Sequence, residues 1–396
     1  MSFGRLAVVV ALGGLLSGAL LAFHYAPTFE AARDATAHVE TLPLGRLLRS
    51  LHHWAGTFTL VLAGLHGILV FARGGHRADG KRLWVLGSFL FLVLLGFSYT
   101  GYLLPGDERG LAGIKVMEGV ASSAPVVGGK AAAVLRGGDA ISSATLTRLY
   151  AVHAFVLPAA LALLLAAFVA SWRRARTAPP RPLLLPAAAT LALLLLAALL
   201  FPPALGAKAD FLGEPPPDAR PEWFFLWVNE LLYRVPGNVF LLAGLLPALL
   251  AALAIGLPYY ARGRRGPEVA AALAVALGIG GLTAASLARA PEHAAGPPAT
   301  AAAPAADVPA ILRKFQCARC HSIDGAASAD DTGPPINRTA AADHPAVKDL
   351  FTREFFRRKV GDPRKYWDLT SMNYTPTRLK PTPEELAALE AWFFDR

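Results

Sequence analysis

Two histidines stand near the ends of one apolar stretch of membrane length. His52 and His66 are 14 residues apart, which comes within about 40° of four helical turns, so both imidazoles leave one side of a helix about 21 Å apart. Neutral imidazole is a common metal ligand, haem iron included. The spacing predicts two axial ligands at two membrane depths, here named the outer level (His52) and the inner level (His66). Two polar residues at the ends of a span are the simpler alternative.

A second apolar stretch, residues 149–172, carries His153 near its start. If it crosses the membrane in the same direction as the first, His52 and His153 lie at one depth and can bind one iron between them. A partner for His66 is expected 14 or 15 residues after His153, where Ala167 and Phe168 stand. We therefore expect one haem b with two ligands at the outer level, whereas a second haem b at the inner level stays open.

Glycines in two other apolar stretches repeat the 14-residue spacing: Gly4 with Gly18, and Gly87 with Gly101. Glycine inside a helix costs about 1 kcal/mol relative to alanine, and a flat macrocycle pressed against the backbone at two depths would explain both pairs. Glycine pairs are also common where membrane helices pack together, and this is the better explanation for one pair alone.

Two arginines precede the outer ligands, Arg49 three residues before His52 and Arg148 five residues before His153. Arginine pairs well with carboxylates, so both are candidates to bind haem propionates. A plain anchor at the membrane interface is an equally good explanation.

One acidic residue, Glu222, lies between a proline-rich segment and a run of aromatic residues in the sequence GEPPPDARPEWFF, residues 213–225. A partly buried carboxyl has a raised pKa and can accept a proton from a hydroquinone. A solvated interfacial glutamate is the more usual case.

The only two cysteines of the chain stand in the sequence Cys-Ala-Arg-Cys-His. Cys317 and Cys320 at this spacing can bind the vinyl groups of a haem c covalently, and His321 is then the proximal iron ligand. A zinc site would need two further ligands from other residue types. Met372 is the predicted sixth ligand of the iron, and His344 is the second choice.

The composition indicates a multi-span membrane protein rather than a soluble enzyme. Of 396 residues, 54% are hydrophobic and 17% charged, and the mean hydropathy is +0.43. We expect an all-α bundle of seven spans, each near the ~20 residues that a bilayer requires. They are residues 4–24, 52–72, 83–104, 149–172, 183–201, 239–258 and 268–288. The first could instead be a signal peptide, although its length and glycines argue against this.

The basic residues report orientation rather than nucleic-acid binding. The net charge of +10 comes largely from three short loops, around residues 73–82, 173–181 and 262–265. Such loops face the cytoplasm. We therefore expect a cytoplasmic amino terminus in a bacterial inner membrane, with everything after about residue 289 on the periplasmic side.

Four segments follow from these patterns: a four-helix haem-binding domain (1–178), a three-helix domain with the Glu222 loop (179–289), an Ala/Pro-rich linker (290–306) and a small all-α cytochrome c domain (307–396).

Five motifs, in order along the chain, resemble those of cytochrome b of the quinol:cytochrome c oxidoreductases, especially the chloroplast and cyanobacterial branch. They are RSLHHW (49–54), GYLLP (101–105), APVVG (124–128), TLTRLYAVH (145–153) and PEWF (221–224). The tail from about residue 306 resembles a class I cytochrome c. The whole chain is thus similar to a fusion of both halves of cytochrome b with its electron acceptor.

The resemblance implies that Glu222 belongs to an outer quinol-oxidation site, with Tyr102, Pro221, Trp223 and Phe224 around the quinol. It also implies a Rieske iron–sulfur partner and a homodimer. Three positions depart from the family's pattern: Gly106 replaces a tryptophan, Phe224 replaces a tyrosine, and the second inner ligand is missing.

We expect a quinol-oxidising electron-transfer subunit, which passes electrons through haem b, the Rieske protein and the tethered haem c to a downstream cytochrome c or oxidase. A variant is a linear relay without a bifurcated cycle. From a different class, the alternative is a membrane-anchor cytochrome of a dehydrogenase, or a partly degenerate scaffold subunit.

Overall fold

The computed structural model describes residues 3–77, 80–138, 140–175, 182–209, 220–235, 239–260, 266–289 and 382–394, and every regular element in these ranges is a helix. Inside hydrocarbon, a helix satisfies all backbone polar groups within one segment, which explains why these apolar sequences fold in this way. The chain divides into two compact units. One is Met1–Asp210 with Asp218–Pro291, and the other is Phe211–Pro217 with Glu292–Arg396.

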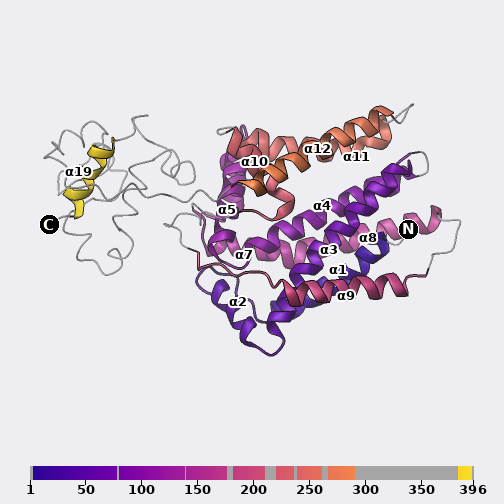
Figure 1. Cartoon of the computed structure of the whole chain (residues 1–396), viewed down its shortest axis with the longest axis horizontal. Coiled ribbons are helices and arrows are strands. Elements are labelled where there is room, and N and C mark those ends of the chain that lie inside the picture. The colour runs from indigo at the N-terminus through magenta and orange to yellow at the C-terminus, as the bar shows by residue number, and fades with distance from the viewer. Residues whose placement is uncertain are drawn as a thin grey trace. The chain divides into compact units, whose positions relative to one another are not determined.

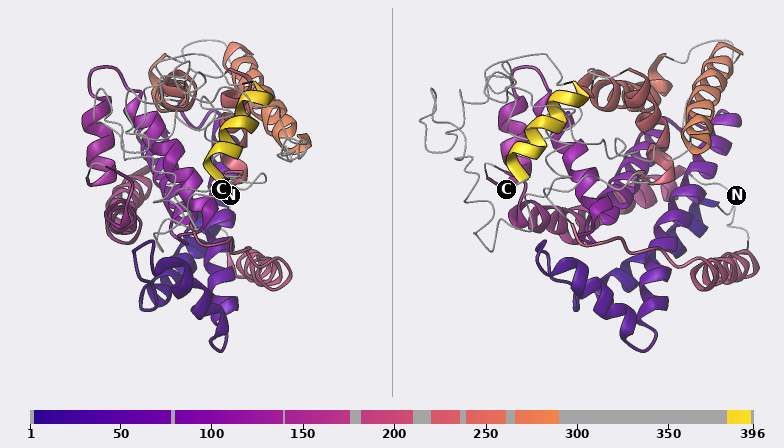
Figure 2. Two further views of the ribbon diagram at one scale, coloured as in Figure 1. Left: turned by 90° about the vertical axis from the view of Figure 1, so that its left-hand side faces the viewer. Right: turned by 60° about the vertical axis from the view of Figure 1, so that its left-hand side comes forward.

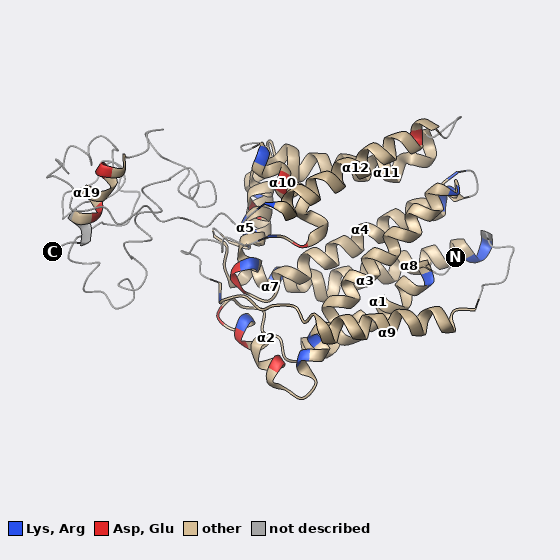
Figure 3. Ribbon diagram, in the orientation of Figure 1, with Lys and Arg blue, Asp and Glu red and all other residues tan. Residues whose placement is uncertain are grey.

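Six helices among the described residues are long and apolar enough to cross a membrane. They are α1 (Phe3–Ala22), α3 (Gly45–Ala72), α4 (Lys81–Leu103), the continuous helix Ser143–Arg174, the helix Phe240–Tyr260 and α12 (Gly266–Ala288). The expected fifth span corresponds to α9 (Leu184–Leu200), which is apolar but only 17 residues long. The prediction of an all-helical membrane bundle is confirmed, whereas the seventh crossing stays a prediction. Charged residues lie near the ends of the long helices, and the middle parts of these helices carry none (Figure 3).

Two helix pairs form the centre of the first unit. Helix α1 packs along α3, and α4 packs along α8 (Leu157–Ala175), while α3 also contacts α4. Helix α9 covers the α1–α3 side, and α11 (Leu246–Tyr260) lies beside α4 on the opposite side (Figures 1 and 2). Helix α8 continues from α7 (Ser143–Ala151) through a π-helical turn, Val152–Val156. This turn contains His153.

Four short helices gather at one end of the bundle, which is the end that carries His52. They are α2 (Ala32–Thr41), α5 (Glu108–Ser122), α6 (Gly128–Arg136) and α10 (Leu226–Arg234). Their core includes Ala32, Leu103, Ile114 and Leu146, all fully buried. This end therefore has a packed apolar core of its own.

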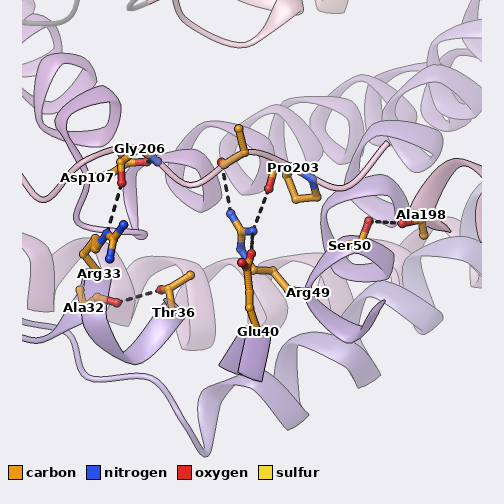
Figure 4. A network of polar contacts seen from close by, with 11 residues as sticks. Ala32, Arg33, Thr36, Glu40, Arg49, Ser50, Asp107, Ala198, Pro203 and Gly206 are labelled. Carbon is orange, nitrogen blue, oxygen red and sulfur yellow. Dashed lines mark hydrogen bonds and ion pairs between the residues drawn. The ribbon is translucent and has the colours of Figure 1, made fainter. Parts of the chain in front are cut away.

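A polar network fastens the segment after α9 to the same end (Figure 4). The buried carboxylate of Asp107 accepts hydrogen bonds from the backbone N–H groups of Gly110 (2.8 Å) and Gly206 (3.0 Å). Arg33 donates to the carbonyl oxygen of Gly206 at 3.2 Å. Because Asp107 caps α5 and also binds the segment after α9, its side chain joins these two parts of the first unit.

Helix α12 is fixed by ion pairs near both ends. Glu230 of α10, fully buried, pairs with Arg234 at 2.8 Å and with Arg289 just after α12. Hydrogen bonds from Arg289, and then from Arg234, hold the pKa of Glu230 below its ordinary value. Near the other end, Glu268 pairs with Arg77 and lies 3.3 Å from His76.

In the second unit the described helix is α19 (Pro383–Phe394), as expected for a helix that starts near Pro383. Thr382 caps it: its hydroxyl accepts from the N–H of Glu385 at 3.2 Å, while the Glu385 carboxylate accepts from the N–H of Thr382 at 2.9 Å. The predicted haem c residues Cys317, Cys320, His321 and Met372, with His344, lie outside the described residues.

Candidate functional site

The structure brings His52 and His153 together, as the spacing predicts. Their ring centroids are 6.2 Å apart, with the ring planes at 76°. Two imidazoles that share one metal ion through bonds of about 2.0–2.1 Å have ring centres roughly 6 Å apart. The outer pair therefore fits a single iron held between α3 and the π-helical turn before α8.

Hydrogen bonds at the other ring nitrogen orient both outer imidazoles. His52 Nδ1 lies 3.0 Å from the carbonyl oxygen of Gly14 and 3.3 Å from Ser17 Oγ. A carbonyl oxygen can only accept, so Nδ1 of His52 carries the proton. This leaves the lone pair of Nε2 for a metal, which is the arrangement that metal-bound histidines use.

His153 is oriented in the same way by Thr100. Its Nδ1 lies 2.9 Å from Thr100 Oγ1, and the Thr100 hydroxyl donates to the carbonyl oxygen of Gly96 at 2.7 Å. The hydroxyl proton is thus used, and the oxygen accepts from Nδ1–H of His153. The sequence does not predict that Thr100, Ser17 and Gly14 contact the histidines, because only packing between helices brings them together.

Each outer histidine lies against one of the predicted glycines. A Cβ built on Gly18 would lie 2.7 Å from His52 Cε1, and one built on Gly101 would lie 3.0 Å from His153 Cε1. Since real Cβ atoms do not approach so closely, a side chain at Gly18 would displace the ring. Glycine is therefore needed for the ligand, beyond any general role in helix packing.

Within the part of the chain that the structure describes, the inner level has one imidazole, that of His66. A Cβ on Gly4 would lie 3.0–3.2 Å from the ring of His66, whereas the atom nearest to a Cβ on Gly87 is Cε2 of Phe168, at 3.7 Å. The structure thus places Phe168, one of the two positions considered from the sequence, across from the α1–α3 pair. The two inner glycines therefore face one imidazole, that of His66, and one phenyl ring, that of Phe168.

The two predicted propionate-binding arginines have other partners here. Arg49 pairs with Glu40 and donates to the carbonyl oxygens of Pro203 (2.8 Å) and Ala204 (3.3 Å). The exposed Arg148 lies over Gly137, whose φ of +78° is typical of glycine. Arg49 therefore joins α2 to the segment after α9 (Figure 4), and binding of propionates stays a prediction for both arginines.

Glu222 stands directly before the turn Trp223–Phe225 that leads into α10. Burial raises the pKa of the Glu222 carboxyl above its ordinary value, and the positive charge of Arg109 partly opposes this. The carboxylate is also close enough to the Tyr102 hydroxyl to interact with it electrostatically. A carboxyl with a raised pKa at this position is a better proton acceptor than an ordinary glutamate.

Aromatic rings link Glu222 to the outer histidines. Phe225 contacts Tyr99 at 5.1 Å between ring centroids, and Tyr99 contacts Tyr102 at 5.7 Å. Phe97, two residues before Tyr99 on α4, lies 5.4 Å from the ring of His153. We missed Tyr99 and Phe225, although Tyr99 lies one helical turn before Tyr102.

The other predicted pocket residues belong to this turn or directly precede it. Trp223 is exposed and contacts Phe224, with 5.5 Å between ring centroids, while Pro221 is half-buried. Gly106 has φ +68°, and a Cβ there would lie 2.8 Å from that of Ala32. This contact explains one departure from the family's pattern, because a tryptophan cannot fit at this position on this backbone.

The fold and the outer site define the class of protein: a helical membrane bundle in which two histidines from different helices lie close enough to share one metal ion. Comparisons with known proteins agree with this class. The sequence model of the family cytochrome b/b6/petB matches residues 1–175.

Individual relatives belong to the same family, and a solved structure has a similar fold. The cytochrome b subunit of the menaquinol:cytochrome c reductase of Bacillus subtilis (strain 168) is 35% identical over 167 residues, which cover 42% of this chain and 75% of that protein. Cytochrome b6 of Synechococcus sp. (strain JA-3-3Ab) is 36% identical over 156 residues, which cover 39% and 73%. The structure titled "Hyperthermophilic respiratory Complex III" has a similar fold, with a TM-score of 0.61 and 21% identity over 73% of this chain and 84% of that chain. The chain belongs to the cytochrome b/b6 family, and this membership implies haem b and electron transport.

Proposed function

We propose that this chain is the electron-transfer subunit of a quinol:cytochrome c oxidoreductase, which oxidises membrane quinol beside Glu222. The observation that carries the proposal is the outer pair, His52 and His153, with both Nδ1 atoms hydrogen-bonded and both Nε2 atoms free for iron. Haem b bound there supplies reversible one-electron chemistry. Two contacts of α4 support the proposal: Phe97 lies against the ring of His153, and Tyr99 lies against Phe225 of the Glu222 turn.

Oxidation of one quinol to quinone releases two electrons and two protons. Burial makes Glu222 basic enough to accept one of these protons, and Tyr102 lies beside it to orient the quinol. One electron would go to a Rieske iron–sulfur partner and the other to a haem b held by His52 and His153, while the second proton would be released on the outer side. We propose Pro221, Trp223 and Phe224 as further walls of the quinol pocket.

The C-terminal residues 307–396 would complete the proposed path of electrons. Cys317 and Cys320 would hold haem c, with His321 and Met372 as iron ligands. A linker of residues 290–306 makes docking of this domain intramolecular, at an effective concentration that can reach about millimolar for a short linker. A downstream cytochrome c or oxidase then takes the electron. We place the outer level at the periplasmic face of a bacterial inner membrane, and the complex as a homodimer.

One observation favours a different function. Among the described residues, His66 has no second imidazole across from it. The path of electrons across the membrane would therefore differ from that of a protein with two histidine ligands at each level. A membrane-anchor cytochrome or a partly degenerate scaffold would tolerate this difference. Inhibitors of quinol oxidation distinguish the two functions, since they would leave cytochrome c reduction unchanged if this alternative holds.

The outer site is tested by replacing its ligands in the purified full chain. His52→Leu and His153→Leu are expected to abolish the low-spin b-type spectrum. His53→Leu is the matched control, because His53 is the neighbouring histidine on α3 but packs on Trp54, with 5.6 Å between ring centroids. An unchanged b-type spectrum in either ligand variant, or equal loss in the control, would overturn the proposal.

A further inference from the structure

Four aromatic rings face the four predicted glycines in one repeated arrangement. Three of these rings are imidazoles and the fourth is a phenyl ring; the pairs are Gly18 with His52, Gly4 with His66, Gly101 with His153, and Gly87 with Phe168. On α3 the two rings are 14 residues apart, whereas His153 and Phe168 are 15 apart. The π-helical turn Val152–Val156 inserts the extra residue. Phe168 therefore occupies the position of a second inner ligand.

The rest of the inner level is still built for a haem. Gly4 lies close against the ring of His66, where a Cβ would come within 3.0–3.2 Å, and Gly87 lies against the ring of Phe168. The Nδ1 atom of His66 is buried and has no hydrogen-bond partner among the described residues. Since none of these residues holds the His66 ring through Nδ1, the lone pair of this neutral imidazole remains available to bind iron.

We propose that the inner level binds a second haem b through His66 alone, with the position on the Phe168 side open to a small neutral ligand such as carbon monoxide. This inference rests on the proposed function, which supplies the haem. A phenyl ring has no lone pair to offer to iron, so the haem has one protein ligand. The nearby ring of Phe91, 3.7 Å from a Cβ built on Gly64, adds to an apolar surface. Apolar surroundings favour a neutral diatomic ligand over an anion such as cyanide.

The test uses carbon monoxide on the dithionite-reduced, purified full chain. We expect about one carbon monoxide-binding b-type haem per chain, and a high-spin EPR signal in the oxidised protein. Phe168→His should supply the missing ligand, so both signals should disappear and low-spin haem b should double. Phe155→His is the matched control: Phe155 is exposed on the same continuous helix, and an imidazole there should leave both signals unchanged.

A second variant keeps the inference testable if Phe168→His does not fold. His66→Leu should remove the carbon monoxide-binding component and keep the outer low-spin haem. The inference is overturned if the wild-type chain binds no carbon monoxide, or if binding survives His66→Leu. In either case the outer spectrum, lost on replacing His52, would show that the proposed function still stands. Absence of any b-type spectrum would overturn both.

Discussion

The hydrogen bond between Thr100 and His153 provides the sharpest test of how the outer site is built. Thr100→Val keeps the shape of the side chain and removes the hydroxyl that lies 2.9 Å from Nδ1 of His153. The Thr100 oxygen is buried between α4 and the π-helical turn. With valine there, the Nδ1–H group loses its acceptor at 2.9 Å and keeps only its interaction with the backbone of Phe97, so the tautomer that leaves Nε2 free is less favoured.

The expected size of the effect follows from this geometry. An unsatisfied buried donor costs about 1–3 kcal/mol, and loss of the partner of a metal-bound histidine lowers metal affinity about 10–100-fold. The two estimates agree, because 1.4 kcal/mol corresponds to about tenfold in affinity. We therefore expect Thr100→Val to bind haem b about 10–100-fold more weakly, while Thr100→Ser restores binding.

The assay is haem b content per chain by pyridine haemochrome during haem titration, together with the midpoint potential of the b-type signal. Thr59→Val is the matched control: Thr59 is also a buried threonine, on α3, but its hydroxyl has no partner among the described residues. Wild-type affinity in Thr100→Val, or an equal loss in Thr59→Val, would refute the role of Thr100.

Three further predictions concern the glycine contact and two carboxylates. Gly18→Val should lower haem b content severalfold, because its side chain would displace the His52 ring, whereas at Gly13 a Cβ meets nothing within 4 Å and Gly13→Val should have no effect. Since the pKa of Glu222 is raised, quinol oxidation should increase with pH as this carboxyl loses its proton, and Glu222→Gln should lower the rate about 10²-fold and flatten that increase. Because the pKa of Glu230 is lowered, its stabilisation is complete above the ordinary pKa of a glutamate and is lost as the pH falls through the lowered pKa of the folded state, so Glu230→Gln should lower Tm at pH 7 but have little effect below that lowered pKa.

Each of these predictions has a result that contradicts it. Equal haem content in both glycine variants would remove the argument from ring contact. A pH–rate profile identical in wild type and Glu222→Gln would exclude Glu222 as the proton acceptor. For Glu230, a difference in Tm that persists below the lowered pKa of this carboxyl would show that the ion pairs with Arg234 and Arg289 do not stabilise α10 against α12.

The sequence alone determined the helical class and singled out the two histidines that the structure brings together at the outer level. Apolar length predicts spans because a helix rises a set distance per residue, and six of the seven expected spans form helices of membrane length. The 14-residue spacing places His52 and His66 on one side of α3, since helical period is a local property. Glu222 was found through its aromatic neighbours, and its burial agrees with the expectation of a raised pKa.

Only the tertiary structure decided what each ligand contacts. The partners of His52 and His153, namely Gly14, Ser17 and Thr100, come from other helices, so no local period predicts them. The same holds for Arg49, which binds Glu40 and backbone carbonyls.

The sequence likewise could not show which residue supplies the ring that faces Gly87. Ala167 and Phe168 were equal candidates across from His66, and the π-helical turn, which adds one residue, brings Phe168 to Gly87. Such a turn depends on how a helix packs against its neighbours, so the spacing along the chain could not reveal it. Local periodicity sets which residues share a helix face, and packing between helices sets what that face meets.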